Sequence, residues 1–391
     1  MLPKLLHVSF DYSEENVGAS TVVVADLINQ TERFSKIEIL SLRRVINPSA
    51  EKLLRVTPKL IKYTIFGLPF SLFLSTDMKR VFRNILKNKE TLKLDFNSFD
   101  LVHGHKLTFE GFLAYKIAKE FNKKLFISLR QTDFYVLKYR KDLLKLCRAI
   151  LLYSSTVFYI APYMKNSLKN LFGESFYEDE LAKKLVYLPN ILNLKKFQAD
   201  QHVERKNLLT IVWLNKKAIE RKNLYRLFQA IKKLKDKNII LDVIGHGDYE
   251  GQVIKWVKDL NIERQVNFLG FISNEQISKY LNKTKAFILP SHSETFGVAY
   301  AEALLCGTPI LYTKNTGFDG IFEDVGVAVD SYSIDSIAKG IIDILDKNEF
   351  YRANIIKLDT NHEFEIFAGD SVASIYQERV NLLNLNSMIS E

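Results

Sequence analysis

The chain has 391 residues, of which 47% are hydrophobic and 26% charged, as expected for a globular protein of about two or three domains. Its two cysteines have neither disulfide nor metal-ligand spacing, which indicates a reducing compartment. The longest uncharged run, residues 149–164, is shorter than the ~20 residues that a membrane span requires.

The net charge of +10 is unevenly distributed along the chain. Residues 1–200 carry 32 basic and 20 acidic side chains, whereas residues 201–391 carry 23 and 25. The most basic segment, residues 41–90, holds 11 basic and 3 acidic residues around an apolar run at residues 63–74. This segment fits an anionic membrane surface and, equally well, a core helix with a solvated basic face.

The first half alternates short apolar segments with helical patterns. The N-terminal apolar run is too short for a signal peptide and is assigned to the first strand. The predicted strands are residues 5–10, 100–105, 125–129, 157–161 and 185–190, and the predicted helices are residues 21–28, 110–121 and a segment from residue 164. Gly18 lies between the first strand and the first helix, where either an anion site or a plain turn is expected.

The second half follows a polar linker at residues 191–207 and repeats the same alternation. The predicted strands are residues 208–214, 239–244, 266–269, 286–289 and 309–312. One predicted helix ends at residue 234, and the others span residues 249–260, 297–307, 333–345 and about 364–383. Strands and helices that alternate with short loops predict an α/β protein with two parallel sheets.

The most informative stretch is the strand, loop, helix and strand at residues 286–312. The loop follows the first strand of this unit, where open parallel sheets bind ligands. Glu294 lies in the loop and Glu302 in the apolar helix, where a carboxylate is costly unless something hydrogen-bonds to it. The backbone N–H groups of residues 295–298 favour a phosphate or a sugar oxygen. The alternative is an ordinary helix cap followed by a solvated glutamate.

The run Ser-Glu-Thr-Phe-Gly, continued by Glu-Ala and Gly-Thr-Pro within residues 293–309, resembles the signature of retaining glycosyltransferases of family 4, of the bacterial surface-glycan type. The resemblance implies the GT-B fold, in which two Rossmann-like domains with parallel sheets face each other across a cleft. It implies an acceptor-binding domain at residues 1–195 and a nucleotide-sugar-binding domain at residues 205–364. A C-terminal helix at about residues 365–391 is expected to pack back on the first domain.

The resemblance also implies roles for single residues in binding the donor. Glu302 would bond the ribose hydroxyls and Glu294 the transferred sugar. Lys222 and Lys216 would neutralise the diphosphate, with Lys216 standing in place of the family's arginine. Further donor contacts are expected from Gly18, Gly245, Phe271, Thr295, Phe296, Gly297 and Val298.

Two residues of the first half are expected on the acceptor side. His105 closes a His-x-His strand end that is common in the family, and local loop bonding is its alternative role. Arg130 stands where many family members have a histidine, and an arginine there suits a phosphate or a carboxylate on the acceptor.

Together these features predict a retaining hexosyltransferase that uses a nucleotide-diphosphate sugar, with UDP favoured and GDP the alternative. The expected acceptor is a lipid-linked saccharide or a growing surface polysaccharide, and the expected location is the cytoplasmic face of the membrane.

No Asp-x-Asp occurs in the sequence, so no metal or other cofactor is expected. The alternatives are a sugar-nucleotide epimerase or a glycosyl phosphorylase on the same fold, and a basic nucleic-acid-binding protein. The sequence has no nucleic-acid-binding motif, so no nucleic-acid partner is expected.

Overall fold

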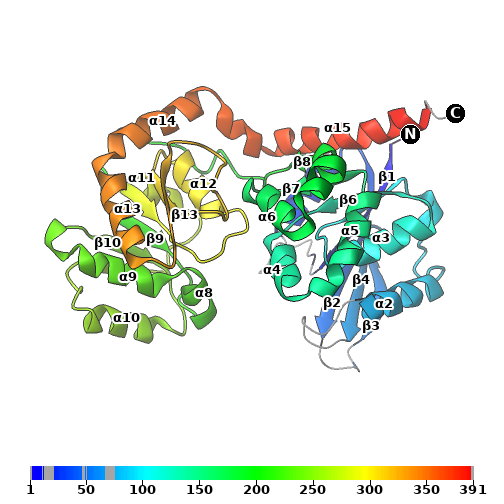
Figure 1. Cartoon of the computed structure of the whole chain (residues 1–391), viewed down its shortest axis with the longest axis horizontal. Coiled ribbons are helices and arrows are strands. Elements are labelled where there is room, and N and C mark those ends of the chain that lie inside the picture. The colour runs from blue at the N-terminus through cyan, green and yellow to red at the C-terminus, as the bar shows by residue number, and fades with distance from the viewer. Residues whose placement is uncertain are drawn as a thin grey trace. The chain divides into compact units, whose positions relative to one another are not determined.

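A computed structural model describes residues 2–10, 12, 22–45, 49, 51–66 and 75–388. The chain forms two compact units (Figure 1). The first unit comprises Met1–Ile160, Met164–Ile191 and Gly369–Glu391, and the second comprises Ala161–Tyr163 and Leu192–Ala368. None of the helices within the described ranges has both the length and the apolar character needed to span a bilayer.

The first unit is built on an eight-stranded sheet with the order β3-β4-β2-β1-β5-β6-β7-β8. Its strands are β1 (Lys4–Phe10), β2 (Lys36–Val45), β3 (Lys52–Thr57), β4 (Leu60–Phe66), β5 (Leu101–Gly104), β6 (Lys124–Ser128), β7 (Thr156–Tyr159) and β8 (Leu185–Tyr187). All neighbours are parallel except β3, which is an antiparallel edge strand beside β4.

Helices connect and cover these strands. They are α1 (Val22–Thr31), α2 (Ser75–Lys87), α3 (Glu110–Glu120), α4 (Gln131–Tyr139), α5 (Leu144–Tyr153), α6 (Tyr163–Phe172), the short α7 (Glu174–Phe176) and α15 (Gly369–Met388). The last helix, α15, lies against the first unit (Figure 1). It joins the core of that unit, where Val372 and Tyr376 pack with Leu5, Phe126 and Phe158. Burial of these side chains explains why the end of the chain belongs to the first unit.

The apolar run inside the basic segment at residues 41–90 begins in a strand. It starts within β4, where Tyr63 is 1% and Ile65 0% exposed. Residues 63–66 therefore belong to a strand and not to a core helix, and the Tyr63 and Ile65 side chains do not face a membrane. The rest of that run, residues 67–74, lies outside the described residues, as does Gly18. A short apolar run cannot by itself distinguish a buried strand from a helix.

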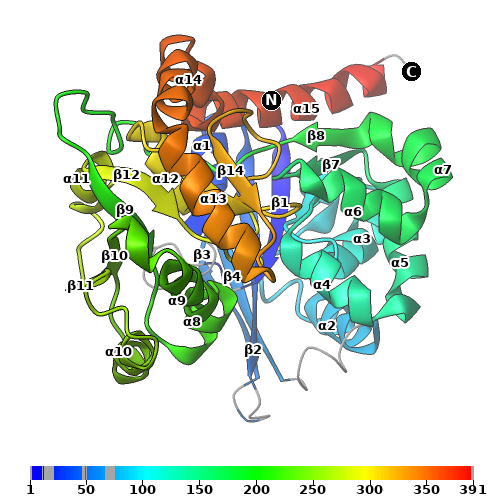
Figure 2. The same ribbon diagram turned by 60° about the vertical axis from the view of Figure 1, so that its left-hand side comes forward.

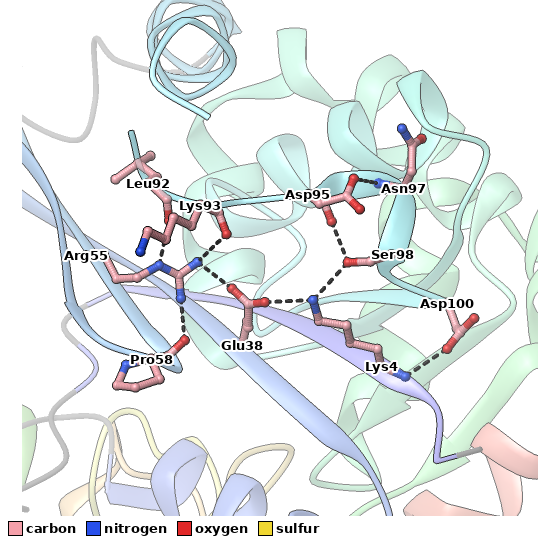
Figure 3. A network of polar contacts seen from close by, with 10 residues as sticks. All are labelled: Lys4, Glu38, Arg55, Pro58, Leu92, Lys93, Asp95, Asn97, Ser98 and Asp100. Atoms are coloured by element: carbon pink, nitrogen blue, oxygen red, sulfur yellow. Dashed lines mark hydrogen bonds and ion pairs between the residues drawn. The ribbon is translucent and has the colours of Figure 1, made fainter. Parts of the chain in front are cut away.

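Several basic side chains of the first unit have internal partners (Figure 3). The Arg55 guanidinium donates to Glu38 Oε2 at 2.7 Å and to the carbonyl oxygen of Leu92 at 2.6 Å. Lys4 Nζ lies 2.8 Å from Glu38 Oε1, so Glu38 pairs with both cations. The network joins β1, β2 and β3 to the segment before β5.

The second unit is a six-stranded, all-parallel sheet with the order β11-β10-β9-β12-β13-β14. The strands are β9 (Lys206–Ile211), β10 (Leu241–Ile244), β11 (Val266–Gly270), β12 (Thr284–Ile288), β13 (Ile310–Thr313) and β14 (Gly326–Val329). The helices are α8 (Lys216–Arg221), α9 (Leu224–Lys233), α10 (Glu250–Asp259), α11 (Ile277–Asn282), α12 (Val298–Leu305), α13 (Ile334–Asp346) and α14 (Asn348–Thr360). Helices α9 and α13 lie side by side against this sheet (Figure 2).

The predicted strand, loop, helix and strand at residues 286–312 is confirmed as β12, α12 and β13. Helix α12 ends where expected, because Gly307 adopts the left-handed φ of +68° that stops a helix. The helix predicted to end at residue 234 is α9, which ends at Lys233. A shorter helix that was not predicted, α8, precedes it, and Asn223 in a left-handed conformation separates the two.

Candidate functional site

The order of the strands in the second unit defines where a ligand is expected. From β9 the chain moves outward through β10 and β11 and then returns to place β12 on the other side of β9. Such a reversal opens a crevice at the carboxyl ends of the two central strands, and open α/β sheets bind their ligands there. The segments that follow β9 and β12 carry Lys222 and Glu294, respectively.

The structure brings Lys222 and Glu294 together. The Lys222 ammonium donates a hydrogen bond to Glu294 Oε1, and the side chains are 18% and 13% exposed. Both charges are therefore partly desolvated and still reachable from solvent, as residues that meet a charged ligand must be.

Asn223 fixes the position of Lys222. Its backbone has a φ of +61°, a conformation that asparagine tolerates better than most residues. Its buried side-chain amide donates to the carbonyl oxygens of Pro290 at 3.0 Å and Ser331 at 2.7 Å. These bonds tie the end of α8 to the segments that leave β12 and β14, which explains how Lys222 reaches a residue 72 positions away.

A second loop, after β13, holds Glu294 from the other side. The backbone N–H of Glu294 donates to Thr316 Oγ1 at 2.9 Å, and its carbonyl oxygen accepts from the N–H of Gly317 at 3.0 Å. Gly317 has a φ of +54°, and a Cβ added there would lie 2.5 Å from Glu294 Cβ. Position 317 therefore requires glycine to keep the Glu294 backbone in this place.

The start of α12 combines a tight turn with free backbone donors. Gly297 has a φ of +89°, and a Cβ there would lie 2.3 Å from the Tyr300 ring. Within the described part of the chain, the N–H groups of Gly297 and Val298 have no hydrogen-bond partner. The Phe296 side chain is 1% exposed and packs on Phe318, so only its backbone can face a ligand, while Thr295 lies in the preceding loop.

Glu302 lies inside α12 with its side chain largely buried. Burial raises the pKa of Glu302 to about 7, and the nearby positive charge of Lys196 opposes that shift. No hydrogen bond or ion pair to the Glu302 carboxylate occurs among the residues that the structure describes. A buried carboxylate without donors is costly, so Glu302 is poised to accept hydrogen bonds from a ligand.

Three aromatic side chains gather at the ends of β9, β10 and β11. Trp213 and Phe271 are 59% and 61% exposed, and His246 contacts both rings with centroid distances of 5.1 Å. Gly245 makes this cluster possible, because a Cβ at that position would lie 1.8 Å from the Val212 carbonyl oxygen. Sequence analysis identified Phe271 and Gly245 and missed Trp213, although a tryptophan directly after a strand could have indicated it.

Among the described residues, no contact joins Lys216 to the Lys222–Glu294 pair. It is the exposed first residue of α8, where Asn215 caps the helix by accepting from the Ala218 N–H at 2.9 Å. Its predicted role at the diphosphate stays a prediction.

The candidate residues of the first unit lie near one another. Arg130 precedes α4 and donates to Asn190 Oδ1 at 3.1 Å, and burial lowers the pKa of its guanidinium to about 10. Asp133 accepts from the Arg130 N–H at 2.9 Å. His105 is 1% exposed and bonds to His7, so the structure places its ring in the interior. A substrate contact for His105 stays a prediction that this burial does not favour.

Comparison with known proteins adds a match to a family model over part of the chain and a similar fold. Residues 195–358 match the family model described as "Glycosyl transferases group 1". That match covers most of the second unit and leaves the first unit outside it.

Two curated relatives illustrate the similarity. The 2-deoxystreptamine N-acetyl-D-glucosaminyltransferase of Niallia circulans is 33% identical over 34% of this chain and 38% of its own length. A diphospho-undecaprenol 4-alpha-N-acetylgalactosaminyltransferase of Campylobacter jejuni is 28% identical over 50% of this chain and 52% of its own length. The chain thus spans about two fifths to half of the length of these relatives.

The sucrose-phosphate synthase of Thermosynechococcus elongatus has a similar structure, with a TM-score of 0.70. The alignment covers 98% of this chain and all of that one, at 17% identity. Together with the two parallel-sheet units, this likeness confirms the predicted GT-B fold class.

Proposed function

We propose that this protein is a retaining glycosyltransferase of family 4 that uses a nucleotide-diphosphate hexose, with UDP favoured over GDP. The observation that carries the proposal is the Lys222–Glu294 pair at the switch point of the second unit, in which Glu294 stands in the loop that leads into the start of α12. The match of residues 195–358 to the glycosyltransferase family model supports it.

Each residue has a role that its surroundings suit. Glu302 accepts hydrogen bonds from the ribose hydroxyls, which replaces the water that burial has removed from its carboxylate. The N–H groups at the start of α12 bind phosphate or sugar oxygens. Lys222 stabilises the negative charge that develops on the leaving diphosphate, and Glu294 holds both Lys222 and a hydroxyl of the transferred sugar.

In the proposed reaction, the bond between the anomeric carbon and the diphosphate oxygen breaks while the acceptor oxygen bonds to the same carbon from the same face. The acceptor hydroxyl proton passes to the leaving phosphate. Lysine side chains supply the positive charge, so we expect transfer to proceed without a metal ion at the diphosphate.

The nucleobase is proposed to lie against Trp213 and Phe271. Both rings are exposed, and each is positioned by backbone bonds between neighbouring strand ends, such as Gly245 N–H to Gly270 carbonyl oxygen at 2.9 Å. Stacking on an aromatic ring is favourable for every base. This platform therefore supports nucleotide binding without choosing between UDP and GDP.

The acceptor is proposed to be a saccharide on a lipid carrier or a growing surface polysaccharide, met at the cytoplasmic face of a membrane. The excess of basic residues in the first half supports this, as does the relative whose name contains a diphospho-undecaprenol saccharide. Ion pairs reduce the charge available for a membrane, because Lys59 pairs with Glu32 and Arg80 with Glu51. Lys62 and Lys79 are exposed and have no ion-pair partner within the described ranges.

A panel of UDP- and GDP-sugars screened by thermal shift tests the donor proposal. Turnover is then measured with the stabilising donor, a saccharide acceptor and no added metal. Expected are a glycoside that keeps the donor's anomeric configuration and a rate that Mn²⁺ or Mg²⁺ does not raise. An epimerised donor sugar in the absence of acceptor, a need for free phosphate, or salt-sensitive nucleic-acid binding with no turnover would each contradict the proposal.

Sedimentation with liposomes tests the membrane proposal. Binding is expected to require anionic lipid and to weaken as salt rises. Lys62→Gln and Lys79→Gln should each weaken it, whereas Lys232→Gln, at an exposed lysine of the second unit, is the control for the same change in net charge. Equal sedimentation with neutral and anionic liposomes would favour a soluble acceptor.

A further inference from the structure

Three histidines meet in the interior of the first unit. His7 comes from β1, His103 from the neighbouring β5, and His105 directly follows β5. His7 and His103 are register partners across the two parallel strands. All three rings are buried, with exposed fractions of 0%, 0% and 1%. One nitrogen of each ring lies within 4.8 Å of a nitrogen of both other rings.

The hydrogen bonds within this cluster leave two ring nitrogens unused. His7 Nδ1 and His105 Nε2 are 2.9 Å apart, so one donates to the other. The opposite nitrogens, His7 Nε2 and His105 Nδ1, are buried and have no partner among the described residues. A buried polar atom without a partner is costly and commonly marks a water or an ion.

We propose that His7, His103 and His105 bind a divalent transition-metal ion of the zinc type. Imidazole nitrogens suit Zn²⁺, Co²⁺ and similar ions, which hold them at about 2.0–2.1 Å. Two such ligands on a tetrahedral ion stand roughly 3.3 Å apart. His7 Nδ1 and His105 Nε2 are 2.9 Å apart, and one nitrogen from each ring lies within 4.8 Å of the other two, so small ring rotations reach that spacing.

Outer contacts orient His103. Its Nε2 lies 2.9 Å from Ser128 Oγ and its Nδ1 lies 3.0 Å from Tyr376 Oη. Metal-binding histidines usually donate the second ring N–H to a neighbouring group, and either hydroxyl can accept it here. Through Tyr376 of α15, the proposed ion would link β1, β5 and the last helix of the chain.

The charges around the cluster come in opposite pairs. The positive charges nearest His105 belong to Arg130 and Lys106. Lys106 Nζ lies 3.0 Å from Glu110 Oε1, and the negative charge of Asp133 acts on Arg130. The cluster therefore lies beside a near-neutral set of charges and not beside a net positive patch.

The test is a metal titration of the tag-free, chelator-treated full chain. Titration with Co²⁺ should saturate at one equivalent and give the visible absorption of four-coordinate cobalt, which one equivalent of Zn²⁺ then removes. Zn²⁺ should also raise the melting temperature. No binding at one equivalent, or Co²⁺ absorption typical of hexaaquo ion, would overturn the proposal and leave a hydrogen-bonded polar core.

Variants locate the ion. His7→Gln and His105→Gln should each lower metal affinity by at least ~100-fold. Ser128→Ala and Tyr376→Phe each remove one hydroxyl beside His103, and the one that removes the outer contact should lower affinity by about 10-fold. His202→Gln, at an exposed histidine of the second unit, is the control and should bind the metal as the parent does. Nucleotide binding by the second unit and the far-UV circular dichroism report on folding. If the histidine variants do not fold, the two hydroxyl variants still decide, because affinity equal to that of the parent in both would contradict the proposed site.

Discussion

The ammonium group of Lys222 donates a hydrogen bond to the carboxylate of Glu294, across 72 residues of sequence and between the segments that follow the two central strands of the second unit. Neither side chain can be changed without leaving the other partly buried and unpaired. The pair is therefore one element of the site, and mutations of its members are expected to interact.

Lys222→Ala should lower turnover by roughly 10²-fold or more, the scale for losing one charged partner of a transition state. Glu294→Gln should slow transfer while leaving nucleotide affinity nearly intact. Because the two residues contact each other, the double variant should differ from the sum of the single effects by more than ~0.5 kcal/mol. Lys232→Ala, on the exposed face of α9, is the control. Strict additivity in steady-state kinetics would mean that the two residues act separately.

Gly317→Ala should impair the site by displacing Glu294. The new Cβ would lie 2.5 Å from Glu294 Cβ, and the φ of +54° disfavours alanine. We expect a loss of roughly 1–3 kcal/mol in unfolding free energy and a ~10- to 100-fold loss of turnover.

The matched control is Gly251→Ala in α10, where an added Cβ meets nothing within 4 Å. That change should stabilise the protein by about 0.5–1 kcal/mol through helix propensity and leave turnover alone. Denaturant unfolding and initial rates measure both variants. Full activity in Gly317→Ala would show that the Glu294 loop tolerates displacement.

Glu302→Gln should separate stability from donor binding. Burial raises the pKa of Glu302 in the folded chain to about 7. Between the pKa of Glu302 in the unfolded chain and pH 7, the folded chain therefore binds a proton that the unfolded chain has lost. Stability from this group is then greatest at low pH and is lost as pH rises through about 7. The neutral glutamine should make the ligand-free protein about 1–3 kcal/mol more stable at pH 8 and nearly unchanged at pH 4.

Donor nucleotide affinity should move the other way. In the parent protein it should rise with pH as Glu302 ionises, and in Glu302→Gln it should be lower and flat across the same range. Melting curves and nucleotide titrations at several pH values measure the two effects. Unchanged nucleotide affinity in Glu302→Gln would remove Glu302 from the donor site.

Trp213→Ala and Phe271→Ala should each weaken nucleotide binding by about 1–3 kcal/mol, the scale for one base stacked on an aromatic ring. Phe350→Ala in α14 is the control, because Phe350 is an exposed aromatic residue outside the cluster. Calorimetric titration with UDP and GDP measures the loss. Affinities equal to the parent's for both nucleotides would exclude the platform as the base site.

The sequence by itself determined the local units of this protein. The β12–α12–β13 segment was predictable because its signals are local: apolar runs of strand length, and glycines at positions 297 and 307 whose positive φ angles begin and end one helix. The alternation of such units predicted two parallel sheets. The carboxylates of the candidate site were predicted from the same stretch, since a glutamate in an apolar helix is unusual wherever it lies.

Only the tertiary structure decided which distant residues meet. The Lys222–Glu294 contact depends on the order of the strands, the Trp213 cluster on three strand ends that meet, and the histidine cluster on the pairing of β1 with β5. Tyr63 and Ile65 are buried in a strand because β4 lies between β2 and β3, which no local pattern specifies. The hydrophobic periodicity of a sequence reports on neighbouring residues within one helix or strand. The long-range contacts depend instead on hydrophobic burial summed over a whole unit, and that burial exists only once the sheet has formed.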